Sequence, residues 1–152
     1  MGTSAVPDVI DALVTACTAA LPNAKVYDGF GISDDPGDFL MIGVDDPDAA
    51  DKANSAESEQ AWANADGTAR DETATITCAA LSWNGDANQK TARDGAYAIT
   101  AAVENLLRAN PSLGLPTVLW TSFGTSSQLT QVQDEQGALA LLVFRIQFRA
   151  RL

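Results

Sequence analysis

The sequence predicts an α+β fold in which two helices pack on a mostly antiparallel β-sheet, within a single domain covering residues 1–152. Two segments carry apolar residues at helical spacing, one near the N-terminus and one in the middle of the chain. Segments typical of strands lie between and after them, and the last of these alternates between apolar and polar residues. A length of 152 residues suits one domain with its own core.

The first helix is expected over about residues 7–21. Pro7 is tolerated in its first turn, where backbone N–H groups have no intrahelical partner, and Pro22 ends it. The apolar side chains that recur at helical spacing are Val9, Ile10, Leu13, Val14, Cys17 and Leu21.

Short strands and turns are expected in the next part of the chain. Residues 25–28 and the apolar run 39–44 have strand character, and an exposed turn over residues 29–38 separates them. Residues 49–60 are small and polar, so we expect a long acidic mobile loop over about 45–60, with a solvent-facing helical piece as the alternative. A further short strand is expected over 60–64, around Trp62.

The clearest strand covers residues 72–83, because apolar residues line one of its faces and threonines the other. Asp86 and Gln89 have capping-box spacing before the second helix, which ends at Asn110. The apolar residues of that helix are Ala92, Ala96, Ile99, Val103, Leu106 and Leu107.

The C-terminal third predicts strands over 117–123 and 128–133, a turn at 134–137, and a long last strand from Ala138. One face of that last strand is apolar. The other face carries three cations, Arg145, Arg149 and Arg151.

The charge of the chain is unevenly distributed. The net charge is −11, and residues 28–72 contain thirteen acidic residues against two basic ones, whereas the remainder contains seven of each. This balance argues against coating of DNA or RNA and against attraction to an anionic membrane, both of which need dense Lys and Arg. The acidic region is either a solvated loop surface or a face that a partner matches.

Histidine is absent, which excludes Ser-His-Asp and Cys-His catalysis and His-ligated zinc. The acidic turns at 34–38 and 45–48 could offer oxygen ligands to a cation, but their spacing misses the calcium-loop pattern and turn chemistry explains them better. The carboxylate pairs at 71–72 and 134–135 are expected to be solvated. We therefore expect no enzymatic activity, no metal and no cofactor.

The remaining features agree with a small globular protein. Cys17 and Cys78 fall on apolar stripes, so we expect two buried free thiols, with a disulfide as the alternative. The three tryptophans are expected to be core or interface anchors. No charge-free apolar run approaches membrane-spanning length, and the acidic N-terminal residues do not resemble a secretory signal, so no membrane partner is expected.

Charge complementarity suggests one role for the two unusual surfaces. The basic last strand of one copy could meet the acidic 28–72 region of the next, and such a head-to-tail contact can close a ring. The alternative is a solvated sheet face. The candidate interface residues are Asp34, Asp35, Asp38, Asp45, Asp46, Asp48, Arg145, Arg149 and Arg151.

The order of several short motifs resembles the tail terminator (tail-completion) proteins of long-tailed, siphovirus-type phages of actinobacteria. The resemblance covers nearly the whole chain and rests on turn and strand patterns, without a catalytic signature. The motifs are Val26-Tyr27-Asp28-Gly29, the run from Ser33 to Asp45, Gln60-Ala61-Trp62-Ala63, Arg70-Asp71-Glu72, Ser82-Trp83-Asn84-Gly85-Asp86, the Ala-rich helix with Arg93, Pro111-Ser112-Leu113-Gly114 and the Arg-ended last strand.

This resemblance implies a subunit of a hexameric ring that stops polymerisation of the tail tube and joins the tail to the head-completion (neck) proteins. It further implies a virion component made in the host cytoplasm, and DNA that passes through the ring without being bound. The alternatives are another head–tail connector, such as a stopper or adaptor, and a small metal-dependent hydrolase that uses the aspartate turns.

Overall fold

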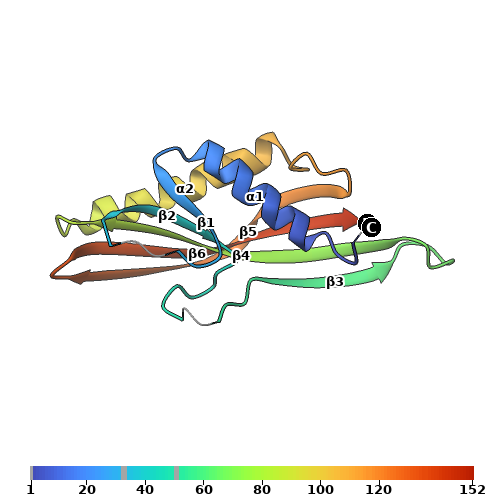
Figure 1. Ribbon diagram of the computed structural model, residues 1–152, viewed down its shortest axis with the longest axis horizontal. Coiled ribbons are helices and arrows are strands. Elements are labelled where there is room, and N and C mark those ends of the chain that lie inside the picture. Colours follow the sequence, from blue (N-terminus) through green and yellow to red (C-terminus); the bar gives the residue numbers. More distant parts are fainter. Residues whose placement is uncertain (1, 32–33, 50–51) are drawn as a thin grey trace.

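The computed structural model describes residues 2–31, 34–49 and 52–152, and it confirms the α+β fold (Figure 1). Within these residues, two helices lie on one face of a six-stranded sheet, and the opposite face carries no helix. The elements are α1 (Val6–Ala20), β1 (Ala24–Asp28), β2 (Gly37–Ile42), β3 (Ala56–Trp62), β4 (Arg70–Asn84), α2 (Gln89–Ala109), β5 (Val118–Asp134) and β6 (Gly137–Arg151).

The sheet has the strand order β1-β2-β4-β6-β5, and β3 pairs with β4 off this path. Among the described strands only the β1–β2 pair is parallel. Strand β4 organises it, because both of its edges are used along most of its length. On one edge β4 pairs antiparallel with β6 from Asp71↔Arg151 to Asn84↔Ala138. The other edge is divided, with β3 beside Arg70–Ile76 and β2 beside Cys78–Trp83.

The core lies between the helices and the sheet. Alternate residues of β4 and β6 face the helices and are buried, among them Ile76, Cys78, Phe144 and Phe148. The predicted stripes of both helices pack against them, α2 over β4, β5 and β6, and α1 over β1 and β2. Gly95 lets α2 approach closely, because a Cβ there would lie 2.3 Å from Ser82 Oγ.

Three sequence predictions need correction. Residues 56–60, expected within the mobile loop, belong to β3, which ends at Trp62 rather than beginning near it. The two strands expected over 117–133 form one bulged strand, β5. The second helix is capped by Asn88, whose side chain accepts from Thr91 N, while Asp86 accepts from Asn88 N. Residues 50–51 of the expected loop lie outside the described residues.

The expectation of a solvated carboxylate pair at 71–72 is also wrong, because Glu72 is fully buried. Its carboxylate accepts from Ser4 Oγ at 2.6 Å, from Ala5 N at 2.7 Å and from Gln60 Nε2 at 3.1 Å. Ala5 is the N-cap of α1, and its side chain makes no capping hydrogen bond. The side chain of Glu72, which lies on β4, caps the helix instead. A negative charge here also complements the positive end of the helix dipole.

Both cysteines are buried free thiols, as expected. Burial raises the pKa of Cys17 to about 11 and that of Cys78 to about 12. Because the thiolate is the reactive form, both groups are chemically inert near neutral pH.

Replacing Glu72 with Ala should lower the free energy of unfolding by roughly 2–4 kcal/mol, because the buried N–H of Ala5 and the side-chain donors of Ser4 and Gln60 lose their acceptor. Urea denaturation followed by circular dichroism measures the change. The matched control is Glu59→Ala, an exposed acid on neighbouring β3, which should change stability by no more than about 0.5 kcal/mol. Equal effects of the two substitutions would contradict the capping role.

Candidate functional site

The helix-free side of the sheet, here called the open face, carries the three predicted arginines, and the pocket that Asp34 and Asp48 line lies on it. The β4–β6 register and the alternation of side chains define it (Figure 1). Its residues are Asp71, Thr73, Thr75, Thr77, Ala79, Leu81 and Trp83 on β4, and Leu139, Leu141, Val143, Arg145, Gln147, Arg149 and Arg151 on β6. Along β6 the open face is therefore apolar where the strand begins and cationic where it ends, and Glu57 and Glu59 of β3 lie on the same face beside this cationic end.

At the cationic end, two arginines share one carboxylate of the same subunit. Arg149 Nη2 donates to Asp71 Oδ2 at 3.1 Å, and Arg151 Nη2 donates to the same oxygen at 3.0 Å while its Nε donates to Oδ1. These hydrogen bonds, led by that from Arg151, hold the pKa of the Asp71 carboxyl below its usual range. The cluster of two cations and one anion keeps one net positive charge.

Arg145, the third predicted arginine, lies further along the open face. Its Nη1 donates to Ser126 Oγ on β5 at 3.1 Å. Within the described residues, no carboxylate lies at ion-pair distance from Arg145. Of the three arginines on this face, Arg145 is therefore the one whose charge no carboxylate of the described residues offsets.

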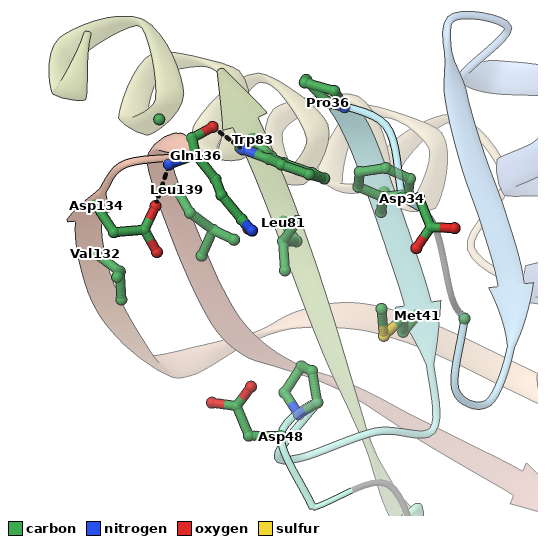
Figure 2. Close-up of a pocket in the computed structure, with 14 residues that line it drawn as sticks. Asp34, Pro36, Met41, Asp48, Leu81, Trp83, Val132, Asp134, Gln136 and Leu139 are labelled. Carbon is green, nitrogen blue, oxygen red and sulfur yellow. Dashed lines mark hydrogen bonds between the residues drawn. The ribbon is translucent and has the colours of Figure 1, made fainter. Parts of the chain in front are cut away.

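At the apolar end, the open face is hollowed into a pocket of about 680 Å³ (Figure 2). Leu81, Trp83 and Leu139 supply its apolar floor, together with residues of β2. Acidic side chains stand around it, and we call Asp34, Asp48 and Asp134 the acidic rim.

The wall of this pocket at the β5–β6 turn is tightly fixed. Trp83 Nε1 donates to Gln136 O at 3.0 Å, and Asp134 Oδ1 accepts from Gln136 N at 2.8 Å. Gly137 is required next to this turn, because its φ is 120° and a Cβ would lie 2.1 Å from Asn84 O. This wall of the pocket is thus held in place by the fold itself.

The predicted acidic residues separate into two groups. Asp34 and Asp48 come from different turns, and both line the pocket. Asp38, Asp45 and Asp46 instead bind their own chain, through Ser82 Oγ, Asn54 N and Asp48 N respectively. Asp35 lies exposed in the turn before β2.

Sequence reasoning missed Asp134, which it treated as solvated turn charge. The hairpin register brings Asp134 opposite Gly137 and so to the end of the sheet that holds Trp83. A prediction of which residues pair in the last hairpin would have placed Asp134 at this end of the sheet.

The described residues, 2–31, 34–49 and 52–152, contain neither a candidate metal cluster nor a candidate membrane-spanning helix. No group of three or more His, Cys, Asp or Glu side chains there is arranged to hold a metal ion. None of the described helices is long and apolar enough to cross a membrane.

The Asp71 cluster makes stability depend on acidity. Because its folded-state pKa is depressed, Asp71 stabilises the fold above its unfolded-state pKa of about 3.9, and this contribution is lost as the pH falls through the folded-state pKa. Asp71→Asn should therefore lower the urea midpoint at pH 7 and differ less from the parent protein as the pH falls through the depressed folded-state pKa. A difference that stays constant over this pH range would contradict the ion-pair assignment.

Comparison with known proteins gives a fold relationship. No family model matches the chain, and no curated protein matches it. Among solved structures, the chain is similar to one chain of a structure described as the virion of a native gene transfer agent (GTA) particle, with 13% sequence identity and a TM-score of 0.66. The match covers 99% of this chain and 100% of that chain, so at this low identity the two share an entire fold.

Proposed function

We propose that this chain is a virion structural protein, and specifically a phage tail terminator that assembles into a hexameric ring. The observation that carries the proposal is the end-to-end fold match with a chain of a gene transfer agent virion. The motif resemblance to tail terminators, found independently in the sequence, supports the same role.

In this role the ring caps the tail tube, ends its polymerisation and joins the tail to the head-completion proteins. The protein acts through its surfaces, without an enzymatic step or a cofactor, and resides in the virion after synthesis in the host cytoplasm. Its net charge of −11 suits a channel that DNA crosses without adhering, because acidic side chains repel phosphate.

The polarity of the open face supports a head-to-tail ring. An acid-rimmed apolar pocket lies at one end of the sheet, and an arginine-bearing surface lies at the other. Two different complementary surfaces on one subunit give a heterologous contact, which closes into a ring when the rotation between subunits permits.

Sedimentation and negative-stain imaging of the purified protein test the ring directly. We expect rings of uniform copy number that bind the ends of tail tubes and halt their growth. Binding to head connectors without binding to tube ends would favour another neck protein, and a protein that stays monomeric at high concentration, with or without tube subunits, would refute the proposal.

Reversing the charge of Arg145 should weaken ring assembly. Arg145→Glu is expected to reduce subunit affinity by roughly fivefold at low salt and by less at high salt, because ions screen exposed charge pairs. The control is Arg108→Glu on α2, where the arginine pairs with Glu104 away from the open face. Sedimentation equilibrium gives both affinities, and equal effects would show that Arg145 faces no neighbouring acid.

A further inference from the structure

We propose that Trp62 is the anchor of the contact between subunits, and that it inserts into the acid-rimmed pocket of the next copy with Arg70 beside the acidic rim. This inference rests on the proposed ring and names the two surfaces that build it. The occupant of the pocket is thus a second copy of this chain.

Trp62 is the most exposed of the large apolar residues that the structure describes, with 65% of its surface accessible. It ends β3 and flanks the β3–β4 turn, which extends beyond the helices at one end of the long axis (Figure 1). Exposed tryptophans in fixed positions are typical anchors of protein interfaces, because the indole buries a large area when it enters a pocket.

The turn holds the Trp62 side chain in place. The Arg70 guanidinium lies 5.8 Å from the ring centroid, and the ring also passes Gly67, where a Cβ would come within 4.0 Å of it. Gly67 has a φ of 70°, which this turn requires. A side chain that is already ordered pays less conformational entropy when it docks.

Hydrogen bonds make the turn itself rigid. Asn64 Oδ1 accepts from Thr68 N and from Ala69 N, and Asp66 Oδ1 accepts from both the backbone N–H and the hydroxyl of Thr68. The carboxylate of Asp66 is thereby held within the turn. Arg70 remains as the cation beside the indole.

The pocket matches this turn in position, polarity and charge. It lies at the other end of β4 from the β3–β4 turn, beside the β5–β6 turn that marks the opposite end of the long axis (Figures 1 and 2). Its apolar floor suits an indole, and its volume of about 680 Å³ leaves room for the flanking backbone. Asp34, Asp48 and Asp134 provide the negative charge that Arg70 would meet.

This separation decides the geometry of association. Trp62 pairs with Arg70 at the start of β4, whereas the pocket lies at the end of this 15-residue strand, so the indole can reach only the pocket of another copy. Each copy then gives one anchor and receives one, which is the arrangement of a closed ring or an open filament.

Two exposed substitutions test the contact without touching the core. Trp62→Ala removes the anchor, and Val132→Arg places bulk and positive charge at the pocket, where Val132 is 46% exposed. We expect each variant alone to associate roughly 30-fold more weakly than the parent protein, as loss of an interface anchor does. The control is Tyr97→Ala on α2, which is also 46% exposed and should assemble normally.

A mixture of the two variants is the decisive experiment. The intact pocket of the Trp62→Ala variant can accept Trp62 of the Val132→Arg variant, so sedimentation velocity should show a one-to-one dimer that does not grow further. Circular dichroism confirms that both variants are folded. If the mixture behaves as the sum of its parts, or if Trp62→Ala still forms rings, the inference is wrong while the ring function stands. A parent protein that never associates would refute both.

Discussion

The antiparallel pairing of β4 with β6 is the constraint on which the rest of the structure depends. It runs from Asp71↔Arg151 to Asn84↔Ala138 and fixes which side chains of both strands face the helices. A shift by one residue would move Phe144, Ile146 and Phe148 to the open face and the arginines into the core. The same register therefore determines the core and the surface that we assign to assembly.

The length of these two strands creates the polarity of the open face. The two ends of these long strands carry different side chains, so one sheet presents an apolar pocket at one end and an arginine cluster at the other. Glu72, a residue of β4, links this sheet to α1, because its carboxylate accepts hydrogen bonds from Ser4 and Ala5 at the N-terminus of the helix. Packing on one face thus leaves the two ends of the subunit available for contacts.

The sequence predicted the helices and strands whose apolar side chains repeat or alternate. It did not predict the features that depend on backbone pairing or on contacts between distant residues. Residues 73–80 and 142–150 alternate clearly, so both central strands and their faces could be predicted. Strand β3 is almost wholly exposed on both faces and lacks that signal; it forms because the edge of β4 beyond β2 needs hydrogen-bond partners. Glu72 is buried through its contacts with Ser4 and Ala5, which are distant in sequence. Asp134 lines the same pocket as Asp34 and Asp48 only because of the hairpin register, and this arrangement is not local in sequence either.

Cross-linking between the two turns tests the head-to-tail arrangement most directly. Ala65→Cys and Glu135→Cys place one exposed thiol on each turn, while Cys17 and Cys78 stay unreactive because burial raises the pKa of both thiols. With a short bis-maleimide reagent, we expect a ladder of covalent oligomers that ends at the copy number of the ring. Cross-linked species no larger than those formed by either single-cysteine variant would contradict it.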